Sequence, residues 1–275
     1  MFSSNAFAAV SGSLPAGFMQ WYVGLMILAV IVGTVADMIH KGSAKYFFAN
    51  ARKTRAQGKP VNKASIAVKT VAVDVLASGE FCNPRRRVAH LLTMYGFILY
   101  VVTTALMVFV YPTAATPTPA LVSQLWWLGG LMVMVGGYWF WFFIRVDVAA
   151  EGSSPLRLMR ADLFILSLLA SVTAGLLWAW LQASGSAASW LFFGLYLLAT
   201  TVLFGGVYWS KFAHMFFKPA AAFDKRLAEA DGTNMNLPLL SRDDPAQRER
   251  HSMELLRDAP MDMGLGIKRE APRHY

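Results

Sequence analysis

The chain has 275 residues, of which 56% are hydrophobic and only 15% are charged. This composition excludes an ordinary water-soluble domain, because such domains carry about 25% charged residues. The single cysteine, Cys82, excludes a disulfide framework, a cysteine-ligated iron–sulfur cluster and a cysteine-based zinc site within one chain.

Several apolar runs reach the length of about 18 residues that marks a transmembrane helix. The sequence predicts an all-α membrane protein, a bundle of five transmembrane helices. The predicted spans are about 18–39, 88–111, 124–144, 161–181 and 190–217. We therefore expect a short N-terminal segment over 1–17, a membrane domain over 18–219 that includes a basic loop, 40–87, and a polar tail over 220–275. Pro219 predicts the end of the fifth helix, because proline disrupts a helix interior.

The basic residues fall on alternate sides of the predicted spans. Loop 40–87 holds eleven of the 25 lysines and arginines, loop 145–160 holds three, and the segment from Lys211 onward holds eleven. The positive-inside rule then predicts an N-terminus outside and a cytoplasmic C-terminus. Because topology accounts for the net charge of +9, the charge does not indicate a nucleic-acid partner. The expected partners are membrane lipid and a cytoplasmic protein.

Two helices are predicted in the polar regions. Valines and alanines recur at helical spacing over 61–75, which predicts an amphipathic helix, either on the membrane surface or free of lipid. In the tail, Asp244, Pro245 and Gln247 form a helix-start pattern, so a short helix to about Arg257 is expected.

His90 and His214 are the candidate site residues. The charge pattern places both at the cytoplasmic ends of their spans, the second and the fifth. Two imidazoles from different helices are one way in which a bundle holds haem iron. Cationic groups at Arg86, Arg87 and Lys211 lie where haem propionates need countercharge. The alternative is that small neighbouring residues pack helices and the arginines anchor the span in the headgroups.

The motif KFAHMFFKP at Lys211–Pro219 and the stretch PRRRVAHLLTMYG at Pro84–Gly96 resemble the gamma subunit of respiratory nitrate reductase. They are also similar to related cytochrome b membrane subunits of sulfur metabolism, such as the quinone-interacting oxidoreductase that works with adenylylsulfate reductase. The resemblance covers about residues 18–219. A five-span chain without iron–sulfur domains looks most like the membrane anchor of dissimilatory adenylylsulfate reductase in sulfur-oxidising bacteria. This resemblance implies that the chain lies in the inner membrane of a bacterium.

Members of the nitrate reductase type bind two b haems through four histidines. The resemblance implies that His90 and His214 ligate the cytoplasmic-side haem. The positions of the other pair hold Tyr100 and Tyr196, and phenols are poor substitutes for imidazoles. One haem b per chain is therefore expected, with the outer site empty.

Two functions follow as hypotheses. In the first, the chain anchors a cytoplasmic oxidoreductase, of the adenylylsulfate reductase type, and passes electrons between it and quinone through the one haem. The chain is then a quinone-reactive subunit of a respiratory complex. In the second, it is a non-catalytic, passive anchor without haem. A transporter is a weaker hypothesis, because its charged sites are expected near the membrane midplane.

Overall fold

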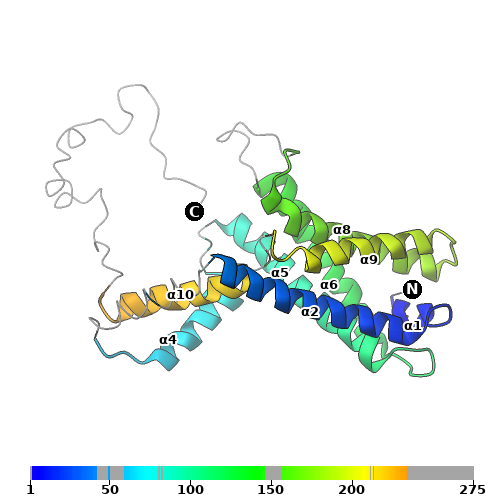
Figure 1. Ribbon diagram of the computed structural model, residues 1–275, viewed down its shortest axis with the longest axis horizontal. Helices are drawn as coiled ribbons and strands as arrows, with labels where there is room; N and C mark the ends of the chain where they lie inside the picture. Colours follow the sequence, from blue (N-terminus) through cyan, green and yellow to red (C-terminus); the bar gives the residue numbers. More distant parts are fainter. Residues whose placement is uncertain are drawn as a thin grey trace. The chain divides into compact units, whose positions relative to one another are not determined.

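The computed structural model describes residues 2–41, 49, 59–79, 81, 83–145, 156–210, 212 and 214–233, without the side chains of Lys41 and His214. The chain divides into two compact units. Unit 1 comprises residues 1–44 and 84–217, and unit 2 comprises residues 45–83 and 218–275. All regular secondary structure in the described part is helical (Figure 1). The predicted all-α class is therefore confirmed for that part, whereas the predicted tail helix near Asp244 lies outside it.

Unit 1 is the membrane unit. Its long helices are α2 (Ala16–Lys41), α5 (Pro84–Ala105), α6 (Ala120–Trp139), α8 (Leu163–Ala183) and α9 (Ser189–Gly205). Short π-helical segments, η2 (Leu106–Val110) and η3 (Phe140–Ile144), extend α5 and α6, and a 3-10 turn, η4 (Arg160–Asp162), precedes α8. Four of the described helical stretches are long and apolar enough to cross a membrane, namely Ala16–His40, Pro84–Val110, Ala120–Ile144 and Arg160–Ala183. The chain is a multi-pass membrane protein.

The fifth predicted span is not one continuous helix. Helix α9 has 17 residues and ends at Gly205, a turn follows over 206–210, and α10 (His214–Ala230) then begins. The prediction that a helix ends near Pro219 is wrong, because Pro219 lies inside α10. Pro219 is the sixth residue of that helix, so the backbone bond that its missing N–H removes would reach back only to Met215, in the first turn.

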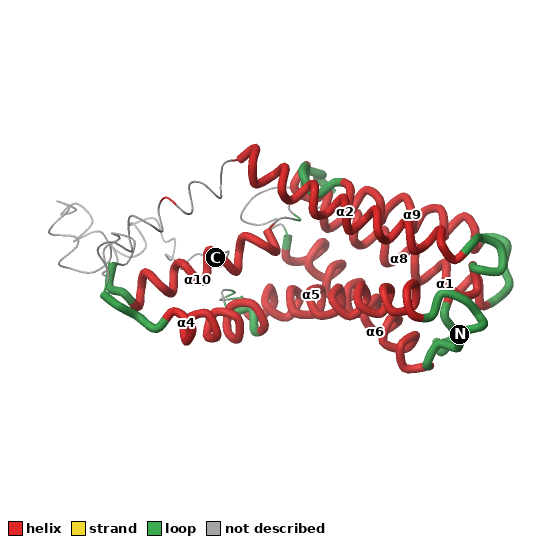
Figure 2. The backbone as a smooth tube through the Cα atoms, turned by 60° about the horizontal axis from the view of Figure 1, so that its bottom comes forward, coloured by secondary structure: helices red, strands yellow, loops and turns green. Residues whose placement is uncertain are grey.

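Helices α5, α6, α8 and α9 pack in sequence order, and α2 packs on α9. Figure 2 shows α8 and α9 side by side. Helices α5 and α6 approach closely through glycine. A Cβ on Gly129 would lie 2.7 Å from the backbone nitrogen of Tyr100 and 2.9 Å from the carbonyl oxygen of Gly96. Small residues are the usual means of bringing membrane helices together, because packing rather than hydrophobic burial drives their association.

The N-terminal segment is part of the core. Asn5 caps α1 (Ala6–Val10) by accepting bonds from the backbone of Phe7 and Ala8, at 2.9 and 3.1 Å. Its amide nitrogen donates to the carbonyl of Tyr111 at 2.9 Å and to the hydroxyl of Thr118 at 3.0 Å. These bonds tie the segment to the turn that follows α5, and they place the ring of Phe7 in the hydrophobic core. Small and polar residues dominate the segment 1–17, so its composition did not predict packing into the core.

A buried ion pair joins the end of α6 to the start of α8. The Arg145 guanidinium pairs with Asp162 and donates through Nε to Oδ1 at 2.8 Å. It also lies over the ring of Trp141, 4.2 Å from the ring centre. Asp162 in turn accepts from the backbone N–H of Met159 at 2.8 Å. Because the charges are matched and hydrogen-bonded, the pair is tolerated in a buried position.

Unit 2 brings the basic loop and the start of the tail together. Helix α4 (Lys63–Lys69) continues into the π-helical η1 (Thr70–Leu76), which confirms a helix over the predicted 61–75 segment. Arg226 on α10 forms a salt bridge with Asp74, with one bond of 2.8 Å. The Arg226 hydrogen bonds, above all, hold the pKa of Asp74 below its usual value. Lys59 adds a backbone bond of 3.0 Å to Asp231.

Candidate cofactor site

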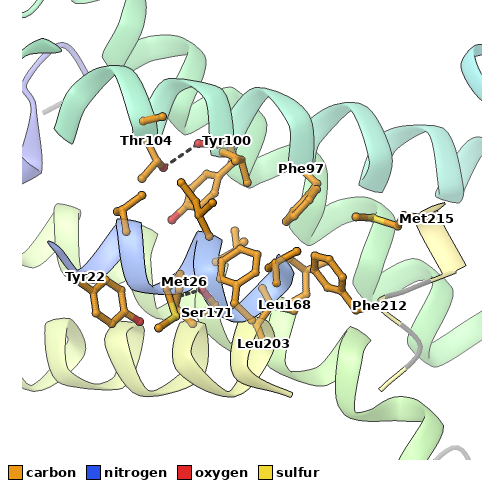
Figure 3. Close-up of a pocket in the computed structure, with 18 of the residues that line it drawn as sticks. Tyr22, Met26, Phe97, Tyr100, Thr104, Leu168, Ser171, Leu203, Phe212 and Met215 are labelled. Atoms are coloured by element: carbon orange, nitrogen blue, oxygen red, sulfur yellow. Dashed lines mark hydrogen bonds between the residues drawn. The ribbon is translucent and has the colours of Figure 1, made fainter. Parts of the chain in front are cut away.

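The interior of unit 1 contains a cavity of about 300 Å³, which Figure 3 shows. Residues of α2, α5, α8 and α9 line it, and Phe212 and Met215 border it near the start of α10. Its walls are almost entirely apolar, with Phe97, Leu168 and Leu203 among them. The volume is at the lower end of the range of natural ligand sites, about 300–1,000 Å³.

Most polar groups on the cavity wall are already hydrogen-bonded. The Tyr22 hydroxyl bonds the carbonyl of Leu197 at 2.8 Å. Ser171 and Thr200 bond each other at 2.7 Å. The Thr104 hydroxyl donates to the carbonyl of Tyr100 at 2.7 Å and accepts from a tryptophan N–H at 2.9 Å.

Tyr100 differs from these groups. Its hydroxyl is fully buried, and no hydrogen bond of good geometry reaches it within the described part of the chain. Its polar neighbour is the Tyr196 phenol, with which it has both an electrostatic and a hydrogen-bonding interaction. Gly175 permits this approach, because a Cβ there would lie 2.6 Å from the Tyr100 hydroxyl oxygen.

Of the two predicted haem ligands, the structure places the backbone of His214 next to a lining residue of this cavity and puts His90 outside the described lining. His90 is half-buried on α5, seven residues before Phe97, so the two share a helix face about 10 Å apart along the axis. His90 itself is not among the described lining residues. His214 is the first residue of α10, next to Met215, which lines the cavity. The His214 side chain lies outside what the structure describes.

The predicted propionate partners are only partly placed. Arg86 and Arg87 lie in the first turn of α5, which begins at Pro84 rather than near residue 88 as predicted. The Arg86 guanidinium donates to the carbonyl of Ile144 at 3.3 Å. Lys211 lies outside the described residues. The structure thus places Arg86 and Arg87 near the same end of α5 as His90. The prediction for Lys211 stays a prediction.

At the other end of the cavity, aromatic rings are packed against one another. Tyr100 stacks on Trp126 with ring centres 4.9 Å apart, and Tyr196 stacks on Trp178 at 5.7 Å. Phe7 packs edge-on against Trp178 at 5.1 Å. We call these five residues the aromatic tier. We call Phe97, Leu168, Leu203, Phe212 and Met215 the cavity tier.

The aromatic tier does not fit a haem. The two phenols offer no imidazole, and each of them stacks on a buried indole ring. Both tryptophans are 1% exposed. The described residues contain no cluster of three or more histidine, cysteine, aspartate or glutamate side chains that could hold a metal ion.

Comparisons with family models, with curated proteins and with solved structures find no match to this chain. The site therefore has to be interpreted from its own chemistry.

Sequence reasoning missed three features of the site. The Ser171–Thr200 bond joins α8 to α9, and spacing within a single helix cannot reveal such a pair. Tyr22 and Phe7 were likewise not singled out, since tyrosines and phenylalanines near span ends are common. The sequence does show many tryptophans, tyrosines and glycines in the predicted spans. That composition does not indicate which of these residues contact one another.

Proposed function

We propose that the chain is a membrane anchor and electron-transfer subunit that carries one b-type haem between His90 and His214. The observation that carries this proposal is the apolar cavity, which lies beside the first turn of α10 and on the helix face of α5 that also bears His90. A haem held there would supply one-electron chemistry. The chain would contribute the imidazoles, a dry wall and the cations of Arg86 and Arg87.

The close packing of the aromatic tier supports one haem rather than two. A flat macrocycle between α5 and α9 at that level would have to displace Trp126 and Trp178. Electrons would then not cross the whole membrane through two haems. Quinone would exchange electrons nearer the end of the bundle that bears His90.

Unit 2 is the proposed docking unit for a cytoplasmic oxidoreductase, of the adenylylsulfate reductase type by the sequence resemblance. The supporting observation is that basic loop and tail form one compact unit, joined by the Asp74–Arg226 salt bridge. Lys63 and Lys69 are exposed in this unit, in which 17 lysines and arginines outnumber 12 aspartates and glutamates. Such an excess of positive charge favours association with an acidic partner surface and makes that association sensitive to salt.

The orientation follows from the same charges, with unit 2 in the cytoplasm of a bacterium. A reporter enzyme fused after residue 152 should be active only in the cytoplasm. An active reporter on the outer side would reverse the orientation and place unit 2 on the wrong side for the proposed partner.

The haem is tested with the purified chain produced with ample haem. A pyridine haemochrome assay with protein quantitation should give about one haem per chain, with a low-spin b-type spectrum. His90→Ala should abolish that spectrum, and His274→Ala is the matched control that should not. A ratio near zero in the wild-type protein would favour the passive anchor, which holds the same partner without a cofactor.

A further inference from the structure

We propose that a groove on the outer surface of unit 1 binds an anionic phospholipid, with one acyl chain in the groove and the phosphate at Arg160. Residues of α6, α8 and α9 form this groove. It shares none of its described lining residues with the interior cavity that is proposed for the haem. Binding of the lipid therefore depends neither on a haem nor on a soluble partner.

The shape of the groove suits a single hydrocarbon chain. It follows the boundary between α8 and α9, which lie side by side (Figure 2), and its volume is about 510 Å³. Its lining residues on α8 extend from Leu163 to Leu177, about 21 Å along the axis at 1.5 Å per residue. This volume, spread over that length, admits one extended chain, whose carbon atoms keep about 4 Å from their neighbours. A further helix, about 10 Å wide, does not fit into it.

The polar groups on the groove wall are already hydrogen-bonded to the protein. The hydroxyls of Tyr138 and Thr173 bond each other at 3.0 Å. The Ser167 hydroxyl donates to the carbonyl oxygens of Leu163 and Phe164. The other described lining residues are alanines, leucines, a valine and a phenylalanine. Because an unmatched polar group is costly on such a wall, the groove favours an acyl chain over a polar ligand.

The groove is open to the bilayer. Leu195 and Leu198 of α9 line it and are 43% and 62% exposed, and Ala170 and Leu177 of α8 line it and are also exposed. In a membrane protein, an exposed apolar surface of this kind meets acyl chains rather than water. A lipid can therefore enter the groove sideways from the bilayer.

A cationic end distinguishes this groove from an ordinary lipid-facing surface. Arg160 lies three residues before Leu163, in the 3-10 turn η4, and residues at that spacing lie on the same face of such a turn. Arg157 and Arg160 are exposed, and their guanidinium groups form no ion pair or hydrogen bond with the described residues. A guanidinium binds phosphate through two parallel hydrogen bonds. Basic sites between spans are known to bind anionic head groups.

The acidic residue beside Arg160 does not neutralise it. Asp162 is buried, pairs with Arg145 and accepts the backbone N–H of Met159. The two exposed arginines therefore carry a positive charge that the described residues leave uncompensated. Because these arginines precede the first residue of α8, the charge lies at the end of a span, where it costs far less than at the bilayer centre.

The test measures lipid binding to the full chain by native mass spectrometry after purification in detergent and delipidation. Dioleoyl-phosphatidylglycerol and dioleoyl-phosphatidylcholine are the probes, because they carry the same acyl chains and only the first has a net negative charge. We expect one phosphatidylglycerol per chain, with phosphatidylcholine binding more weakly. Arg160→Gln should weaken phosphatidylglycerol binding about fivefold, the effect of one cation near anionic head groups, and leave phosphatidylcholine binding unchanged. Lys63→Gln, at an exposed position of unit 2, is the matched control and should bind as the wild type does.

A second pair of variants tests the groove itself. Ala170→Phe places a ring in the groove and should weaken the binding of both lipids. Gly24→Phe on α2, where nothing lies within 4 Å of an added Cβ, is its control and should bind both lipids normally. Thermal unfolding of each variant establishes that a change lies at the site rather than in the fold. If Ala170→Phe does not fold, the comparison of Arg160→Gln with Lys63→Gln decides the question alone.

Four results would overturn the proposal. Equal affinity of the wild type for the two lipids would mean an annular lipid only. Equal weakening by Arg160→Gln and Lys63→Gln would assign the binding to overall charge. A folded Ala170→Phe variant with normal binding would place the lipid outside the groove, and a dimer that this substitution dissociates would assign the groove to a second copy of the chain. The haem count is measured separately, so none of these results decides the proposed function.

Discussion

The two tiers of the bundle are both built from large apolar and aromatic side chains, but they differ in how closely those side chains pack. In the aromatic tier, Tyr100 stacks on Trp126 and Tyr196 stacks on Trp178. In the cavity tier, a short distance along the same helices, phenylalanines and leucines border a void. Among the described residues, Phe7 of the N-terminal segment adds a ring to the first tier. A ligand site in a membrane bundle is thus a place where the packing has been left incomplete.

The largest expected effect comes from the close contact between α6 and α5 at Gly129, next to the backbone of Tyr100. Gly129→Leu would drive a side chain into the backbone of α5, where even a Cβ lies 2.7 Å from the nitrogen of Tyr100. Because backbone cannot move aside as a side chain can, we expect little folded protein. Size-exclusion chromatography of detergent extracts measures this.

The control is Gly24→Leu on α2, where nothing lies within 4 Å of an added Cβ. This variant should be produced and purified like the wild type. If the two variants behaved alike, close packing of α5 on α6 would not be what holds the aromatic tier together.

A smaller effect is expected when a ring is removed from the aromatic tier. Truncation of a buried tryptophan costs about 3–5 kcal/mol in water-soluble cores, and packing contacts also hold membrane helices together. Trp178→Ala should therefore lower the thermal midpoint of the detergent-purified protein by about 6 °C or more. Trp21→Ala, at a site 78% exposed, should lower it little. Equal midpoints would mean that the aromatic tier is not tightly packed.

The smallest effect is expected from placing imidazoles at positions 100 and 196. The double variant Tyr100→His, Tyr196→His should keep about one haem per chain in the pyridine haemochrome assay. The reason is steric, since Phe7, Trp126 and Trp178 occupy the space a second macrocycle needs. A ratio near two would show that ligand identity alone, and not packing, separates the two tiers.

Much of the fold followed from the sequence because hydropathy reports the lipid environment directly. Apolar runs located the four long spans to within a few residues. The starts and ends were less accurate, since Pro84 can occupy the first position of α5 and bring the arginines into the helix. The break after Gly205 was missed because the residues that follow are apolar as well, and composition does not distinguish an apolar turn from an apolar helix.

The candidate site was predictable only in part. His90 and His214 stood out because ionisable groups near the membrane are uncommon, whereas the cavity depends on distances between helices that no single segment encodes. The Asn5 bonds to Tyr111 and Thr118 span more than a hundred residues, so no local pattern predicts that the N-terminus packs into the bundle.

The early end of α9 has a consequence for the surrounding lipid. Its 17 residues span about 26 Å at 1.5 Å per residue, whereas the hydrocarbon layer is about 30 Å thick. The longer spans of the same unit show no such deficit. Should α9 cross the membrane, a mismatch of about 4 Å would favour a locally thinner bilayer and shorter acyl chains beside this helix.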